Sequence, residues 1–381
     1  MRIGIAYDCI FPFDTGGGER VYRAMADQLT DRGHDVTYLT RVHKGGYPGA
    51  VFRVVEVSSG RIYDSAGDRT TLGALHFAWG VFRHLVAHRR NYDLLIVSAL
   101  PVLTLLAARV AMLGARASLV ADWLEVWSWR KWREYSGGAV GTVAAVLQWF
   151  GARATRTNTV NSRFTAQRLL AINRHATPIV LGLFDLAADS ASVQAAASPP
   201  VALFVGRWIA DKRIPSLPAA IVHARSRVPD LTCSIVGSGS EEGAIRSAID
   251  SASAAEFVTV LGRIDDAAHD VQLSSAAVLV NPSAREGFGL VITEAASRGV
   301  PVVVVAGEDN ASVELLSVGV NGFIAADTSP IALGDAIADA VLAGPALRTS
   351  SASWFVAERA SATLSHSLDA ILSARSTPSS T

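Results

Sequence analysis

The stretch Asn281-Pro-Ser-Ala-Arg-Glu286-Gly-Phe-Gly-Leu-Val-Ile-Thr-Glu294-Ala-Ala-Ser-Arg-Gly299-Val-Pro301 decides the fold of the second half of this chain. Gly287 and Gly289 can adopt positive φ angles and allow backbone N–H groups to approach a ligand closely. Residues 290–298 then have the apolar spacing of a helix. A helix that begins directly after such a loop directs its N-terminus, and the positive end of its dipole, toward an anion.

The end of this predicted helix is equally clear. Gly299 stands where a left-handed residue commonly ends a helix, and Pro301 follows closely. Residues 302–305 are four valines, which suit a buried parallel strand. The sequence therefore predicts a loop, a helix and a strand, with Glu286 in the loop and Glu294 on the helix.

Length and composition predict two domains. The chain has 381 residues, 50% of them hydrophobic, and this exceeds what a single core usually sustains. Its two cysteines, Cys9 and Cys233, indicate neither a disulfide framework nor a cysteine-based metal site, which is typical of a cytoplasmic protein. Residues 1–7 begin directly as a strand, so no signal peptide is expected, and Arg109 and Arg116 interrupt the apolar stretch 99–120, so no membrane-spanning helix is expected.

Charge is distributed unevenly along the chain. Residues 1–183 hold 22 Lys+Arg against 13 Asp+Glu, whereas residues 184–381 hold 12 against 21. A basic first half favours an anionic acceptor or peripheral contact with a membrane surface, although charge pairing between domains would leave the same totals. Nucleic acid is not expected as a partner because no recognised binding motif accompanies the charge.

Both halves alternate strand-like and helix-like segments, which predicts βαβ units and parallel sheets. In the first half strands are expected at 2–7, 35–40, 51–57 and 93–98, with a helix at about 18–30. In the second half they are expected at 201–205, 231–236, 257–261, 277–281 and 302–305. The intervening segment 187–200, rich in Ala, Ser and Pro, marks a linker. Two doubly wound domains of this kind bind ligands beyond the carboxyl ends of their strands, so a cleft between them is the expected site.

Two cations follow the first strand of the second half, in Val205-Gly206-Arg207-Trp-Ile-Ala-Asp-Lys212. Arg207 and Lys212 should emerge at the carboxyl end of that strand. A planar guanidinium and a compact ammonium together can neutralise a pyrophosphate as a glycosyl–phosphate bond breaks. Two solvated surface cations remain the structural alternative.

Three glycine-containing turns also follow predicted strands. Phe13-Asp-Thr-Gly16-Gly17-Gly18-Glu19-Arg20-Val21 has the composition of a phosphate-cradling loop, without the Gly-x-Gly-x-x-Gly spacing of a dinucleotide site, and a tight turn with no ligand is the alternative. Gly237-Ser-Gly239 and Gly262-Arg263-Ile264 are weak signals alone, because a turn needs glycine for its own sake.

Taken together, these segments resemble the retaining family-4 glycosyltransferases of the GT-B superfamily (glycosyl transferases group 1). The chain matches their Glu-x7-Glu segment, their Gly-Gly-x-Glu-Arg loop and their Gly-Arg…Lys pair, with Arg213 where a glycine is usual. The resemblance implies two Rossmann-like domains facing a central cleft: residues 1–184 for the acceptor, a linker at 185–199, and residues 200–352 for the nucleotide sugar. The last helix, at about 353–372, would return to the first domain.

The resemblance also implies roles for individual residues. Glu286, Arg207 and Lys212 would act in catalysis, with Glu286 contacting the donor sugar; neither glutamate need be a nucleophile, because the leaving phosphate would take the acceptor proton. The donor-binding residues would be Gly17, Gly18, Gly237, Arg263, Ile264, Phe288, Gly289, Leu290 and Glu294. No cofactor and no metal are implied. The donor would be a UDP- or GDP-linked sugar and the acceptor a glycolipid, saccharide or other small molecule.

One segment departs from the resembled pattern. Ala121-Asp122-Trp123-Leu124-Glu125-Val126-Trp127 resembles an Asp-Trp-His-Glu-Val-Trp stretch in one branch of the family, and it supplies Asp122, Trp123, Glu125 and Trp127 as acceptor-side candidates. Leucine at 124 cannot make the hydrogen bond of that histidine. Either the donor sugar lacks a hydroxyl there, or the chain is a weak or inactive homologue that acts as a donor-binding or scaffold subunit. A GT-B sugar-nucleotide epimerase is a separate alternative for the whole chain, and it would convert the donor without an acceptor.

Six of the eight tryptophans lie between Trp79 and Trp149, interleaved with Arg130, Lys131 and Arg133. Aromatic rings beside cations suit sugar stacking or a membrane interface, and an aromatic core under a loop explains them equally well.

Overall fold

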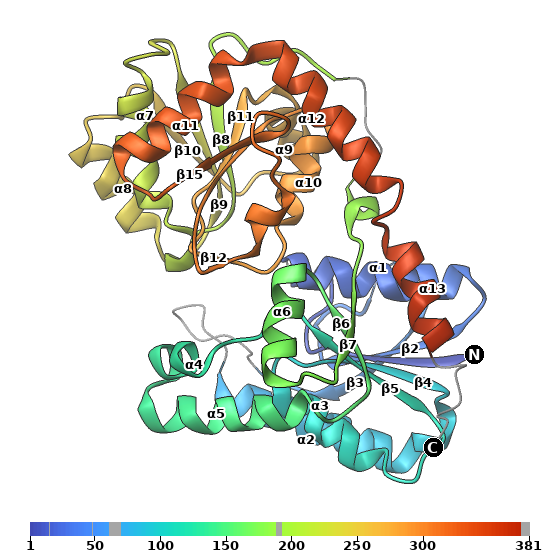
Figure 1. Cartoon of the computed structure of the whole chain (residues 1–381). Helices are drawn as coiled ribbons and strands as arrows, with labels where there is room; N and C mark the ends of the chain where they lie inside the picture. The colour runs from blue at the N-terminus through green and yellow to red at the C-terminus, as the bar shows by residue number, and fades with distance from the viewer. Residues whose placement is uncertain (15, 48, 61–69, 188–192, 375–381) are drawn as a thin grey trace. The chain divides into compact units, whose positions relative to one another are not determined.

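The computed structural model describes residues 1–374 except 15, 48, 61–69 and 188–192, and it divides into two compact units (Figure 1). Met1–Leu186 and the segment from Ala362 onward form the N-terminal unit. Ala187–Ser361 form the C-terminal unit. Each unit is built on its own parallel sheet.

The N-terminal unit contains a seven-stranded parallel sheet in the order β3-β2-β1-β4-β5-β6-β7. Its strands are β1 Arg2–Ala6, β2 Asp35–Arg41, β3 Arg53–Ser58, β4 Leu94–Ser98, β5 Ser118–Trp123, β6 Thr157–Val160 and β7 Thr177–Val180. Its helices are α1 Gly17–Asp31, α2 Thr71–His88, α3 Val102–Ala111, α4 Trp129–Ser136, α5 Gly138–Gly151, α6 Arg163–Ile172 and α13 Leu364–Ala374. Strand β4 is buried along its whole length, as apolar parallel strands covered on both faces are.

Helices cover both faces of this sheet. Helix α2 packs on α3 and α3 on α5, whereas α1 packs on α13 at the opposite face (Figure 1). The chain order reverses between β1 and β4, which lie side by side at the centre. In open α/β sheets such a reversal is where ligands bind, because the loops leaving the two central strands diverge there.

The C-terminal unit repeats this plan with six parallel strands in the order β10-β9-β8-β11-β13-β15. They are β8 Val201–Arg207, β9 Thr232–Ser238, β10 Val258–Gly262, β11 Val278–Asn281, β13 Val302–Val305 and β15 Gly322–Ala325. The helices are α7 Leu217–Ala224, α8 Glu242–Ser251, α9 Asp266–Ser275, α10 Leu290–Ser297, α11 Pro330–Leu342 and α12 Gly344–Arg359. A two-stranded ribbon pairs β12 Arg285–Glu286 with β14 Asp309–Asn310. The reversal of strand order falls between β8 and β11.

Most sequence expectations for these elements are confirmed to within a few residues. The segment that opened the sequence analysis forms α10, then Gly299 at a left-handed φ of 71°, then strand β13. Amide hydrogen bonds from Gly299 to Ala296 and from Val300 to Ala295 satisfy the carbonyls at the helix end.

Two boundaries differ from the expectation. The single helix expected at 353–372 is two helices, α12 and α13, separated by residues 360–363. The first belongs to the C-terminal unit, and only the second lies in the N-terminal unit, where the amide of Leu364 binds the carboxylate of Asp185 at 2.7 Å. The break meets Gly182, where a side chain would clash with the backbone of Ala362.

The segment expected as a linker is also more structured than its composition indicates. Residues 188–192 lie outside the described part of the chain. Beyond them the carbonyl of Gln194 accepts a hydrogen bond from Arg348 at 2.9 Å, and the amide of Ala197 binds the carbonyl of Ser275 at 2.8 Å. The second part of the expected linker is therefore fixed on the C-terminal unit.

In the described part of the chain, no helix taken singly has the length and apolar character needed to cross a membrane. One bent pair, Pro330–Leu342 with Gly344–Ala374, meets the criteria of length and composition when the two are counted together.

Candidate active site

The donor-side residues predicted from the sequence follow four neighbouring strands of the C-terminal sheet. Arg207 ends β8, Gly237 lies in the end of β9, Arg263 follows β10, and Glu286 follows β11. Because all four strands are parallel, these residues lie at one edge of the sheet. The structure thus brings together residues that are up to about 80 positions apart in the sequence.

An ion pair stands at the point where β8 and β11 diverge. Lys212, in the short helical turn Ala210–Lys212 after β8, places its Nζ 2.5 Å from Oε2 of Glu286. Each of the two side chains is 18% exposed, so the pair is largely withdrawn from solvent but still open on one side. Only this open side is available to a ligand.

Electrostatics keep Glu286 ionised. Burial by itself would raise the pKa of Glu286, but the charge of Lys212 and the hydrogen bonds from Lys212 and Asn281 outweigh it, with a further contribution from the charge of Arg207. The pKa of Glu286 therefore lies below its ordinary value. At neutral pH the site presents a carboxylate flanked by two cations.

A network of amide and hydroxyl groups positions Glu286 from behind. Asn281 Nδ2 donates to Glu286 Oε2 at 3.4 Å, and the hydroxyl of Ser283 donates to Oδ1 of Asn281. Asn310 Nδ2 donates to the carbonyl oxygens of Ser283 at 3.1 Å and Val305 at 2.8 Å. These residues were not among the predicted site residues.

Position 213, where the resembled family usually has a glycine, has a backbone conformation that favours glycine. The residue has a φ of 49° and a ψ of 31°, a left-handed conformation that glycine adopts without steric cost. The turn is required because residues 210–212 must bring Lys212 back toward β11. An arginine here therefore adopts a conformation that glycine would adopt more readily.

Helix α10 presents its N-terminus at the same edge. Gly289 precedes it with a φ of 103°, and Glu294, on the second turn, is 9% exposed. Leu290 is also buried, whereas Phe288 is partly exposed. The prediction that one glutamate lies before the helix and one on it is confirmed, with Glu286 in the two-residue strand β12 rather than in an open loop.

The glycines of the turn after β9 have a packing role. A side chain on Gly237 would clash with the carbonyl of Gly206, and one on Gly239 would clash with the backbone of Trp208. The φ of Gly237 is 136°, which few other residues adopt. The indole Nε1 of Trp208 is buried beside this turn and has no hydrogen-bond partner in the described structure. Arg263 is exposed after β10, with Ile264 partly buried beside it.

In the N-terminal unit the glycine loop leads from β1 into α1. Gly16 is the N-cap, and Gly17 and Gly18 form the first helical turn with Glu19, whose side chain is buried. The hydroxyl of Tyr7 donates to Glu19 Oε1 at 3.4 Å. A methyl group placed on Gly18 would lie 2.9 Å from the Tyr7 hydroxyl and 3.1 Å from a methyl carbon of Leu124.

Tyr7 is therefore a residue that the sequence analysis missed. Its hydroxyl, after β1, and the side chain of Leu124, after β5, border the same glycine, Gly18. The resembled branch has a histidine at position 124, and this chain has a phenol beside that position instead. Nothing in the sequence around Tyr7, which follows a strand, indicates this proximity.

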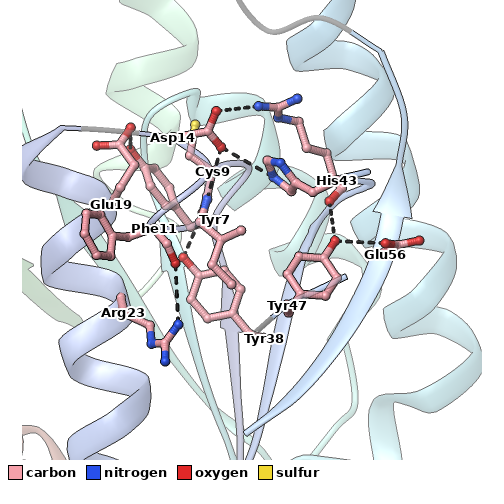
Figure 2. A network of polar contacts seen from close by, with 12 residues as sticks. Tyr7, Cys9, Phe11, Asp14, Glu19, Arg23, Tyr38, His43, Tyr47 and Glu56 are labelled. Carbon is pink, nitrogen blue, oxygen red and sulfur yellow. Dashed lines mark hydrogen bonds and ion pairs between the residues drawn. The ribbon is translucent and has the colours of Figure 1, made fainter. Parts of the chain in front are cut away.

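A polar network holds the loop between β1 and the glycines in place (Figure 2). Asp14 accepts a hydrogen bond from the amide of Ile10 at 3.2 Å, pairs with Arg41, and lies 3.4 Å from Nε2 of His43. The Tyr38 hydroxyl donates to the carbonyl of Cys9 at 2.9 Å. Burial and the neighbouring charge of Arg41 lower the pKa of His43. The loop is thus fixed by strand β2 and the segment after it.

Two of the acceptor-side candidates lie in the core and do not line a site. Asp122 is fully buried at the end of β5 and accepts hydrogen bonds at 2.5 Å from both Tyr22 and Thr159. Trp123 is 1% exposed, with its indole N–H bound to Asn158 at 2.9 Å. Both expectations need correction, because consecutive residues of a strand covered on both faces cannot reach an acceptor.

The other two candidates belong to the loop that follows β5. Trp127 donates its indole N–H to Glu125 at 2.5 Å, and its backbone binds the side chain of Gln148 on α5. Trp132 donates its indole N–H to the same Gln148 oxygen at 3.1 Å. Glu125 is partly exposed, whereas Trp127 is buried at 8% exposure, so Glu125 is the member of this set whose side chain is open to solvent.

Two known protein families match the two units of the chain. The family described as "Glycosyl transferases group 1" matches residues 187–350. The "Glycosyl transferase 4-like domain" matches residues 16–182. The chain belongs to the group 1 glycosyl transferases. Its two parallel-sheet units are the two Rossmann-like domains of the GT-B fold.

Individual relatives of this glycosyl transferase match over shorter stretches. It is 35% identical over 101 residues, 26% of its length, to the "UDP-N-acetylglucosamine--peptide N-acetylglucosaminyltransferase GtfA subunit" of Streptococcus gordonii, and covers 19% of that protein. It is 31% identical over 133 residues, 33% of its length, to a "Phosphatidyl-myo-inositol mannosyltransferase" of Propionibacterium freudenreichii, and covers 32% of that protein. The aligned stretches thus span a third or less of these relatives.

Among solved structures, Anabaena HepE in complex with UDP and glucose is similar over the whole fold. The TM-score is 0.71 at 18% sequence identity, covering 98% of this glycosyl transferase and 99% of HepE. At this level of identity the likeness concerns the fold.

Proposed function

We propose that this group 1 glycosyl transferase moves a sugar from a nucleoside diphosphate sugar, UDP- or GDP-linked, to a hydroxyl group of a glycolipid, saccharide or small-molecule acceptor. The observation that carries the proposal is the Lys212–Glu286 pair at the divergence of β8 and β11. A carboxylate fixed between two cations, beside a helix N-terminus, suits a sugar joined to a diphosphate.

On the donor side, Arg207 and Lys212 would contact the diphosphate and stabilise the negative charge that grows on it as the bond to the sugar breaks. Glu286 would accept hydrogen bonds from the sugar hydroxyls. Glu294 would hold the ribose, with Phe288, Gly289 and Leu290 along the phosphates and sugar, and Arg263 with Ile264 near the base. Gly237 would allow close approach of the backbone.

The proposed reaction retains the anomeric configuration and needs no metal ion. The bond between the anomeric carbon and the β-phosphate oxygen breaks while the acceptor oxygen bonds to the same carbon from the same face. The departing phosphate oxygen takes the acceptor proton, so the nucleoside diphosphate leaves with it. In this scheme the cations supply the charge stabilisation that a metal supplies in other transferases.

The N-terminal unit would bind the acceptor. Gly17 and Gly18 would approach the donor phosphates and the reacting hydroxyl, while Glu125 and Trp127 would contact the rest of the acceptor. Two of the relatives described above are named for a lipid-linked and a peptide acceptor, and UDP occurs in the name of one and in the HepE complex. They support a UDP-linked donor more than a GDP-linked one.

A cytoplasmic location with peripheral contact to a membrane is part of the same proposal. It is supported by the excess of 22 Lys+Arg over 13 Asp+Glu in residues 1–183. No nucleic acid partner is proposed.

A second candidate function is a donor-binding subunit with weak or absent transfer activity. Leu124 favours it, because the leucine borders Gly18 where the resembled branch has a hydrogen-bonding side chain. Such a subunit would bind the nucleoside diphosphate without turning over any sugar nucleotide.

The test is release of nucleoside diphosphate from UDP-, GDP- and ADP-linked sugars, with and without a pooled extract of lipid and saccharide acceptors. Acceptor-dependent release supports transfer. If the labelled sugar recovered on the acceptor has the same anomeric configuration, α or β, as in the donor, the transfer is retaining. Activity that persists in EDTA supports metal independence. Nucleotide binding without release favours the donor-binding subunit, and donor conversion without an acceptor favours an epimerase.

A further inference from the structure

Helix α5, Gly138–Gly151, carries its large apolar side chains on the outside. Val140, Val143, Val146, Trp149 and Phe150 recur at helical spacing on one side, and each is between 42% and 57% exposed. The buried side of the same helix consists mainly of small residues. A helix of a water-soluble domain normally has the reverse arrangement, with its large apolar side chains toward the core.

Close packing explains the small residues on the buried side. A side chain on Gly141 would clash with the backbone of Trp132 on α4, and a methyl group on Gly151 would lie 2.5 Å from a methyl carbon of Val102 on α3. These contacts press α5 against α3 and α4 and account for its inner face. They do not account for three valines and two aromatic residues on its outer face.

Cations stand near both ends of helix α5. At its beginning, α4 supplies Arg130, Lys131 and Arg133, with Glu134 paired to Arg130 at 2.7 Å. At its end, the guanidinium of Arg153 lies 3.7 Å from the ring centre of Trp149. The apolar strip therefore runs between two basic groups.

The basic group at the end of α5 surrounds a cavity of about 670 Å³. Arg109, Arg153, Arg156 and His175 line it together with Leu113 and Met112, and no carboxylate is among its described lining residues. Its volume lies within the range of small-ligand pockets. It opens at the amino ends of β5, β6 and β7, the edge of the sheet opposite the glycine loop.

Helix capping explains only part of this charge. Arg153 donates to the carbonyl oxygens of Trp149 at 2.9 Å and of Ile172 at 2.5 Å, at the ends of α5 and α6, and Arg109 stands in the last turn of α3. Arg156 precedes β6 and His175 precedes β7, so neither ends a helix. Arg156 and His175 therefore line the cavity without serving to cap the neighbouring helices.

We propose that the outer face of α5 docks on the surface of a bilayer containing anionic phospholipids. The valines and aromatic rings lie at the boundary of headgroups and acyl chains, and the arginines at the two ends of the helix bind lipid phosphates. Trp149, stacked under Arg153, suits the interface because its ring is apolar and its N–H remains in the headgroup layer. The proposal gives the peripheral membrane contact suggested above a defined surface.

Charge distinguishes this occupant from a second copy of the chain. Two copies meeting through α5 in an isologous contact would bring the basic groups of one copy toward those of the other, and Glu134 on α4 is already paired with Arg130. An anionic lipid surface complements both groups at once.

The experiment is sedimentation of the protein with vesicles of phosphatidylcholine containing phosphatidylglycerol, compared with vesicles of phosphatidylcholine alone, without donor or acceptor. We expect binding to the mixed vesicles. Val143→Asp should weaken it roughly tenfold or more, since a charge enters the apolar strip. Arg109→Gln with Arg156→Gln should weaken it by roughly fivefold for each arginine removed, with a smaller dependence on salt.

Val271→Asp is the matched control, because Val271 on α9 of the C-terminal unit is 64% exposed and lies outside the strip. Circular dichroism and the oligomeric state are recorded for each variant. Absent binding by the wild type, equal binding to the two vesicle types, or equal loss in Val271→Asp would overturn the proposal. So would dissociation of a wild-type dimer by Val143→Asp, which would assign the strip to a second copy.

This surface and the proposed sugar transfer can fail separately. Vesicle binding without nucleotide release would retain the docking surface and remove the activity. Nucleoside diphosphate release with a soluble acceptor, but without vesicle binding, would retain the activity and remove the docking surface.

Discussion

Removal of Lys212 should expose how strongly the proposed site depends on the charge of Glu286. At the observed N···O separation of 2.5 Å, the attraction between two unit charges is about 7 kcal/mol at an effective dielectric constant of about 20. Lost hydration offsets much of this, and removing one member of a buried pair typically costs 3–5 kcal/mol. Because each side chain is 18% exposed, we expect Lys212→Met to destabilise the C-terminal unit by about 3 kcal/mol, at the lower end of that range.

The size of this effect should depend on pH. The folded-state pKa of Glu286 is lowered, so the pair contributes its full stability above the unfolded pKa of about 4.3 and loses it as the pH falls through the folded pKa. In Lys212→Met, burial acts on Glu286 with less opposition and raises its pKa. Protonation then removes the unpaired charge, so the deficit should shrink on acidification from neutral pH.

Hydrogen exchange followed by mass spectrometry can assign this loss to one unit. At neutral pH, amides of β8 and α10 that exchange through unfolding should do so roughly 100-fold faster, the equivalent of about 3 kcal/mol, whereas those of β1 and β4 stay unchanged. The double variant Lys212→Met/Glu286→Gln should recover most of the difference, since no charge is left unpaired. A change below about 0.5 kcal/mol, or a double variant as unstable as the single one, would refute the reasoning.

Three further variants test other parts of the structure. Burial raises the pKa of Asp122 to about 6, so the folded state binds this proton more tightly than the unfolded state, and the wild-type free energy of unfolding falls as the pH rises from about 4 to 6. Asp122→Asn should remove this dependence of the N-terminal unit's stability on pH. Urea unfolding that still shows the same pH dependence in the variant would contradict this. Gly237→Ala should lower the melting temperature of the C-terminal unit, with a loss of about 3 kcal/mol from the clash with Gly206 and the φ of 136°, whereas Gly243→Ala, at an open helical position, should not. Tyr7→Phe should destabilise the N-terminal unit by about 1–2 kcal/mol in urea, because buried Glu19 loses a donor; unchanged stability would show that their contact at 3.4 Å contributes nothing.

Local patterns were sufficient to predict the segments whose signals are adjacent in sequence. Helix α10 was predicted because glycines stand just before its start, at Gly289, and just after its end, at Gly299, where positive φ angles favour glycine. Nine of the sheet strands were predicted for a similar reason, since buried parallel strands are nearly continuous apolar runs, but β5, β6, β7 and β15 were not predicted. The left-handed turn at Arg213 was visible only as a departure from the resembled pattern.

Contacts between distant segments were not predictable in this way. Lys212 and Glu286 are 74 residues apart, and only the neighbouring positions of β8 and β11 in the sheet bring them together. Asp122 and Trp123 were misjudged because motif position carries no information on burial. Helix α5 is apolar almost all round, so its sequence could not show that its valines face outward while Gly141 and Ala145 face the core.

The central claim, that the edge of the C-terminal sheet binds and activates a nucleoside diphosphate sugar, is tested most directly with Glu294. The measurement is acceptor-dependent release of nucleoside diphosphate by the wild type, Glu294→Ala and Glu256→Ala, the last an exposed glutamate elsewhere in the same unit. The account predicts turnover in the wild type and in Glu256→Ala, and loss of about 100-fold or more in a folded Glu294→Ala, as expected when charge-assisted hydrogen bonds to the donor are removed. Equal turnover in all three proteins would contradict it.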